Sequence, residues 1–85
     1  MSKEGMRMPL SSDLTETCMQ FIRETLHMSD EQTLSVYEMG LFKTKWSTYT
    51  LRAKCRIGAP GVTESPWFNF KMVIGREKLH ESSGN

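Results

Sequence analysis

The sequence predicts an α+β domain in which one N-terminal amphipathic helix packs on a three-stranded antiparallel β-sheet. Two patterns carry this prediction. Apolar residues recur at every fourth position from residue 14 to residue 26, which is the spacing of one helix face. Apolar and polar residues alternate strictly from residue 46 to residue 57, which is the spacing of a strand with one buried face. Burying the helix stripe against the apolar sheet face gives a two-layer domain.

The size and composition of the chain fit one small folded domain. It has 85 residues, of which 38% are apolar and 25% charged. Residues 1–10 have no apolar period, and Pro9 disfavours helical geometry at Met8, so we expect a flexible leader there. The single domain is then expected at 11–80, and a polar, flexible tail at 81–85.

The helix is predicted over residues 13–28. Asp13 and Glu16 have the spacing of a capping box, and acidic residues in the first turns oppose the positive end of the helix dipole. The apolar stripe that must be buried consists of Leu14, Cys18, Ile22 and Leu26.

The next segment, residues 29–40, admits two structures. Ser29 and Gln32 have capping-box spacing for a second helix, whereas the β-branched and aromatic residues after them favour a strand. We predict a strand at 33–39, followed by a turn at Gly40. A helix there would leave only a two-stranded hairpin.

The alternating segment 46–57 is the clearest strand. Its odd-numbered side chains from Tyr49 to Ile57 are expected to face the core, and its even-numbered ones to face solvent. Residues 58–66 form a turn-rich loop, and the alternation resumes at 67–74, so the two strands are predicted to pair as an antiparallel hairpin that ends at Gly75. Residues 76–80 are expected to form a short helical turn.

The order helix, three strands and short final helix is similar to that of a double-stranded-RNA-binding domain. The run Tyr49–Gly58, YTLRAKCRIG, resembles the middle strand of that family in its alternation. The segment Gly75–Ser82, GREKLHES, departs from the family because two glutamates lie where the family has a basic, small-residue segment opening its last helix. The resemblance therefore implies an architecture and carries over no functional residue.

Charge is divided between the two halves of the chain. Residues 1–40 hold three cations and seven carboxylates, a net charge of −4, whereas residues 41–85 hold eight cations and three carboxylates, a net charge of +5. A local excess of Lys and Arg favours an anionic partner. The alternation predicts that basic and aromatic side chains share the open face of the sheet, and the candidate binding residues there are Trp46, Arg52, Lys54, Arg56, Trp67 and Lys71.

This pattern predicts a non-enzymatic binding module for an anionic macromolecule. Cations can follow phosphates while aromatic rings stack on unpaired bases, so single-stranded RNA or DNA is favoured over an acidic protein surface. Three alternatives stay open. The face can be an ordinary solvated sheet surface, or the docking surface of a small regulatory or inhibitory protein, as phages and mobile elements encode, on a protein partner. The acidic helix and the basic strands can also mate in a homo-oligomer.

Enzymatic chemistry is not expected. His27 and His80 have no recognisable pairing with a nucleophile or a carboxylate, the glycines form no phosphate-binding motif, and the sequence predicts no cofactor and no metal site. Cys18 and Cys55 lie on apolar faces and are predicted to be buried free thiols, with a disulfide between them only in an oxidising compartment. No apolar run is long enough for a secretory signal or a membrane span, so a cytoplasmic protein is expected.

Overall fold

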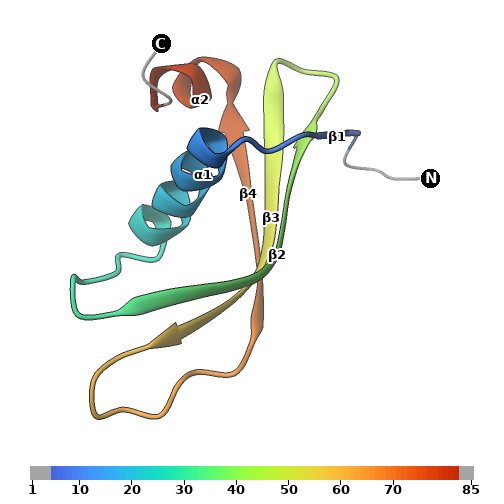
Figure 1. Cartoon of the computed structure of the whole chain (residues 1–85). Coiled ribbons are helices and arrows are strands. Elements are labelled where there is room, and N and C mark those ends of the chain that lie inside the picture. Colours follow the sequence, from blue (N-terminus) through green and yellow to red (C-terminus); the bar gives the residue numbers. More distant parts are fainter. Residues whose placement is uncertain (1–4, 83–85) are drawn as a thin grey trace.

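The computed structural model describes residues 5–82, with side chains as far as Leu79 (Figure 1). This part of the chain forms an α+β fold with an antiparallel sheet, as the sequence predicts, but the sheet has four strands instead of three. The elements in chain order are β1 (Met6–Met8), α1 (Ser12–Thr25), β2 (Thr33–Lys43), β3 (Thr48–Gly58), β4 (Phe68–Gly75) and α2 (Arg76–Ser82).

The helix α1 begins one residue before the predicted start at residue 13 and ends three residues before the predicted end at residue 28. The hydroxyl of Ser11 caps the helix by accepting a hydrogen bond from the Leu14 amide at 3.1 Å, so the cap precedes Asp13 by two residues. At the other end the Met28 amide donates to the Arg23 carbonyl at 3.0 Å, and His27 takes the left-handed conformation with φ 54°. This is a Schellman motif, which ends the helix before residue 28.

The additional strand is β1, which lies in the segment expected to be a flexible leader. It pairs antiparallel with the end of β2, with Met6 opposite Lys43 and Met8 opposite Leu41. Met8 and Leu10 are partly buried against the core. The leader therefore contributes an edge strand to the domain, and residues 1–4 lie outside the described chain. A strand before α1 also changes the element order on which the resemblance to double-stranded-RNA-binding domains depends.

Strand β2 is longer than expected, and the predicted turn at Gly40 is wrong. The spacing of Ser29 and Gln32 closes a turn instead of starting a helix, because the Gln32 side chain accepts from the Ser29 amide at 2.9 Å. The strand then runs through Gly40 to Lys43, and the chain reverses at residues 44–47. There the Thr44 amide donates to the Thr48 carbonyl at 3.1 Å.

A β-bulge interrupts the pairing of β2 with β3. Val36 lies opposite Cys55 and Glu38 lies opposite Lys54, so Tyr37 is an extra residue on β2. A bulge bends the strand that contains it. In Figure 1, β2 curves partway along its length.

The predicted hairpin of β3 and β4 is confirmed, and β4 ends at Gly75 as expected. The expected helical turn after it is the helix α2, which extends through residues 81 and 82 of the predicted tail; residues 83–85 lie outside the described chain.

The helix α1 lies against one face of the sheet (Figure 1), and the core fills the space between the two layers. The buried apolar residues are Cys18, Phe21, Ile22, Leu34, Leu41, Tyr49, Leu51, Ala53, Cys55, Phe70, Ile74 and Leu79.

Candidate functional site

The alternation of side chains along β3 shows which residues lie on the sheet face that turns away from α1. Because Tyr49, Leu51, Ala53 and Cys55 point into the core, the side chains between them point to the opposite face. Arg52 and Lys54 on that face are exposed. The pairing of the strands places residues of β1, β2 and β4 beside them on the same face. We call this surface the open face, and it comprises Arg7, Tyr37, Glu38, Gly40, Phe42, Thr50, Arg52, Lys54, Arg56, Trp67, Asn69, Lys71 and Val73.

Five of the six candidate residues lie together on the open face. Arg52, Lys54 and Arg56 follow one another along β3, and Lys71 lies directly opposite Arg52 on β4. The Trp67 ring lies under the guanidinium of Arg56, whose Cζ is 5.0 Å from the ring centroid. The prediction from alternation therefore places these five side chains on one surface.

The sixth candidate, Trp46, is not brought to this surface. It lies in the turn between β2 and β3, beyond the start of β3, and is 78% exposed. Its amide donates to the Thr44 hydroxyl at 3.2 Å, a hydrogen bond within the turn. Extending the alternation into the turn was the error, because period-2 geometry holds only within a strand.

Thr50 also differs from expectation. It was expected on the solvent-facing side of its strand, yet only 6% of its surface is exposed. Its cross-strand neighbours on the same face are Phe42 and Val73, which are larger and flank it on both sides. The open face is therefore apolar around Thr50 and basic further along β3.

Two aromatic rings and two cations meet at one end of the open face. The ring centroids of Tyr37 and Trp67 are 5.8 Å apart and the rings are tilted by 53°. Lys54 Nζ lies 6.0 Å from the centroid of Tyr37, and Arg56 lies over Trp67. Tyr37 is 66% exposed and Trp67 39% exposed, so both rings offer area to a ligand. We call these four residues the aromatic cluster.

The bulge in β2 explains why sequence reasoning missed Glu38. Simple alternation from the buried Leu34 would turn Tyr37 outward and Glu38 inward. The extra residue resets the parity, so that Glu38 lies beside Lys54 on the open face as well. No turn residue or proline marks the bulge in the sequence, and only the pairing reveals it.

Arg56 is held in place by the loop that follows β3. Its Nε donates to the Ser65 carbonyl at 3.0 Å, and its guanidinium lies 3.6 Å from the Glu64 carboxylate. The Ser65 hydroxyl in turn accepts from the Ile57 amide at 2.9 Å. A half-exposed ion pair of this kind contributes little stability, so the main effect of these contacts is to fix the guanidinium over Trp67.

Strand β1 adds another cation. Arg7 donates to the Met39 carbonyl at 3.2 Å, and its guanidinium carbon lies 5.5 Å from the centroid of the Phe42 ring. The open face thus carries five cations (Arg7, Arg52, Lys54, Arg56 and Lys71) and one carboxylate (Glu38). On the opposite layer, the exposed carboxylates of α1 are Asp13, Glu16 and Glu24. The open face therefore has a net positive charge, although Arg7 and Glu38 on it come from the acidic half of the sequence.

The described residues offer little for metal or nucleophilic chemistry. Among the side chains of residues 5–79, no three of the metal-binding types gather at one place. Cys18 and Cys55 are free thiols with no exposed surface, so the disulfide alternative is not realised. Burial raises the pKa of Cys18 to about 11, which keeps that thiol protonated near neutral pH.

No helix in residues 5–82 has the length and apolar character needed to span a membrane. The chain matches no protein-family model, no curated protein and no solved structure in the comparisons made with it.

Proposed function

We propose that the protein is a non-enzymatic binding module that takes single-stranded nucleic acid on the open face of its sheet. The observation that carries the proposal is the aromatic cluster beside a row of cations. Exposed aromatic rings supply stacking surfaces for unpaired bases, and stacking contributes about 1–3 kcal/mol per base. The neighbouring Lys and Arg side chains neutralise phosphates of the same strand.

A single strand fits this surface better than a duplex does. In a duplex the base faces are already stacked, so rings such as Tyr37 and Trp67 cannot pack on them without unstacking. A helix that enters a major groove would need a basic face. The exposed side of α1 carries Asp13, Glu16 and Glu24, which repel phosphates.

We further propose a cytoplasmic location. Free thiols at Cys18 and Cys55 are typical of a reducing compartment. This inference is independent of the ligand.

The salt dependence of binding tests the electrostatic part of the proposal. Binding of the wild-type protein to a single-stranded ten-mer should weaken as salt rises, with a slope of log K against log salt of about −0.7 per phosphate neutralised. Replacing Lys54 and Lys71 together by glutamine should make that slope shallower by about 1.4, because two phosphate contacts are lost. Fluorescence anisotropy at several salt concentrations measures both slopes.

Lys43→Gln is the matched control. Lys43 is exposed but lies opposite Tyr49, whose side chain is in the core, so Lys43 projects to the other side of the sheet. The Lys43→Gln substitution should leave the slope of log K against log salt unchanged. Absence of binding, or a flat salt response in the wild-type protein, would reject the proposal.

A protein partner is the second candidate function, and the sheet edges favour it. The exposed apolar side chains Met6 and Val73 lie on the two outer strands β1 and β4, and an edge strand can accept another chain by strand addition. If the protein is a regulator or inhibitor that docks in this way, a pull-down with it should recover one partner protein in stoichiometric amount. Alanine at Met6, which does not belong to the open face, would then reduce recovery, whereas nucleic-acid binding would survive that change. Self-association between the acidic helix and the open face would appear instead as a molecular mass in solution that rises with protein concentration.

A further inference from the structure

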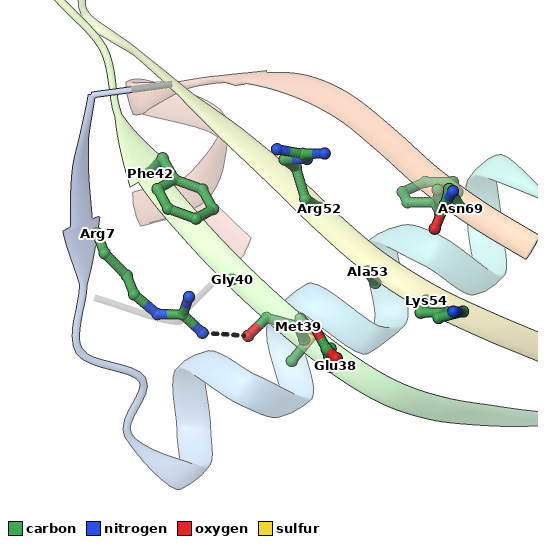
Figure 2. Close-up of a pocket in the computed structure, with 10 residues that line it drawn as sticks. Arg7, Glu38, Met39, Gly40, Phe42, Arg52, Ala53, Lys54 and Asn69 are labelled. Atoms are coloured by element: carbon green, nitrogen blue, oxygen red, sulfur yellow. Dashed lines mark hydrogen bonds between the residues drawn. The ribbon is translucent and has the colours of Figure 1, made fainter. Parts of the chain in front are cut away.

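A depression of about 340 Å³ lies in the open face (Figure 2), and Lys54 of the aromatic cluster is one of the residues that line it. It is lined by side chains from all four strands, among them Arg7, Glu38, Phe42, Lys54 and Asn69. Its volume is at the lower end of the roughly 300–1,000 Å³ typical of small-molecule pockets. The space therefore suits a group about the size of a nucleotide.

Gly40 is one of the lining residues, and it is buried because Phe42 and Arg7 pack over it. A Cβ at this position would lie 2.9 Å from an edge carbon of the Phe42 ring and 3.4 Å from the guanidinium carbon of Arg7, so a larger residue would displace these two side chains. We call this space the Gly40 depression.

The depression is lined by three cations, Arg7, Arg52 and Lys54, and by one carboxylate, Glu38. Glu38, Lys54 and Asn69 form one row across β2, β3 and β4, because Lys54 is the register partner of both neighbours. Among the described residues, no salt bridge or hydrogen bond engages the Glu38 carboxylate. A carboxylate opposes phosphate binding, but it accepts hydrogen bonds from the amino and imino groups of a base.

The position of the depression also fits a base. It surrounds Gly40, which lies on β2 between Tyr37 of the aromatic cluster and Phe42. Tyr37 and Phe42 are five positions apart, or roughly 16 Å along a strand. A single strand that stacks on the aromatic cluster and continues towards Phe42 passes over the depression, and one of its bases can turn into it.

We propose that the Gly40 depression is a base-selective subsite that takes one unpaired guanine. This inference rests on the proposed binding of single strands and adds selectivity to it. Guanine presents two adjacent donors, N1–H and N2–H, that match the two oxygens of the Glu38 carboxylate. Asn69 supplies an amide for another edge of the same base. Thymine and uracil offer a single imino donor between two carbonyl oxygens, which the carboxylate repels.

The test uses four single-stranded DNA ten-mers: oligothymidylate, and the same strand with its central nucleotide changed to dG, dA or dC. The wild-type protein should bind the dG strand at least about fivefold more tightly than oligothymidylate, as a bidentate base contact predicts. In Glu38→Gln this preference should disappear. The affinity of that variant for oligothymidylate should be equal to or higher than wild type, because a negative charge has left a basic face.

Glu64→Gln is the matched control, because it removes the same charge from a loop residue that contacts Arg56 and does not line the depression. It should keep the preference for dG. Equal wild-type affinity for all four strands, or an unchanged dG preference in Glu38→Gln, overturns the subsite while leaving single-strand binding in place. Absence of wild-type binding to every strand refutes the proposed function itself.

Discussion

Replacing Tyr37 or Trp67 with alanine is expected to weaken binding of a single-stranded ten-mer by roughly 5- to 150-fold for each ring that stacks on a base. Both rings are exposed and their centroids lie 5.8 Å apart, so a single strand can contact both of them. Because they touch, the double variant should lose less than the product of the two single losses. Anisotropy titrations of the three variants at one fixed salt concentration measure the effect.

Two matched variants distinguish a loss of base stacking from a general disturbance of the folded protein. Trp67→Phe keeps an aromatic plane and should recover much of the affinity that Trp67→Ala loses. Trp46→Ala removes the other indole, which lies at the hairpin turn and not on the open face, and should change affinity by less than about twofold. Equal losses in Trp46→Ala and Trp67→Ala would mean that the open face has no special part in binding.

Replacing Leu51 with alanine should lower the free energy of unfolding by about 2–5 kcal/mol. Leu51 has no exposed surface and lies on an inner strand, between Leu41 of β2 and Met72 of β4. A small domain has only about 5–15 kcal/mol of stability in total. The variant should therefore melt at least about 10 °C below the wild type.

Val73→Ala is the control for this effect. Val73 lies on β4 but is exposed on the open face, so its truncation should cost less than about 0.5 kcal/mol. Thermal and urea denaturation followed by circular dichroism measure both changes. A loss below about 1 kcal/mol in Leu51→Ala would contradict the parity that turns Leu51 inward and Arg52 outward.

The parts of the fold that sequence patterns predict correctly are those determined locally. The helix stripe and the alternation of β3 both come from side-chain periodicity, because one face of each element must leave water. The alternation from Tyr49 to Cys55 was enough to predict that Arg52 and Lys54 share the opposite face. The Schellman motif at His27 was harder to predict, since Gly is the usual residue at that position.

The parts that patterns miss depend on pairing between distant residues. Strand β1 is three residues long, too short to show a period, and it forms because the end of β2 offers it a partner. The bulge at Tyr37 likewise exists only in the register of β2 against β3. These two features bring Arg7 and Glu38 to the open face. Sequence analysis therefore identified the cations of β3 and β4 and Trp67, but it missed Tyr37 of the aromatic cluster and the residues that β1 and β2 contribute to the depression.

The most direct measurement of the central claim is the fluorescence of Trp67 in the Trp46→Phe variant during titration with a single-stranded oligonucleotide. This variant keeps only the indole on the open face. Base stacking on Trp67 should quench its emission in proportion to the fraction bound, whereas Trp67→Phe, which keeps only Trp46, should bind with little change in emission. An oligonucleotide that binds without altering Trp67, or that quenches Trp46 alone, would contradict the account.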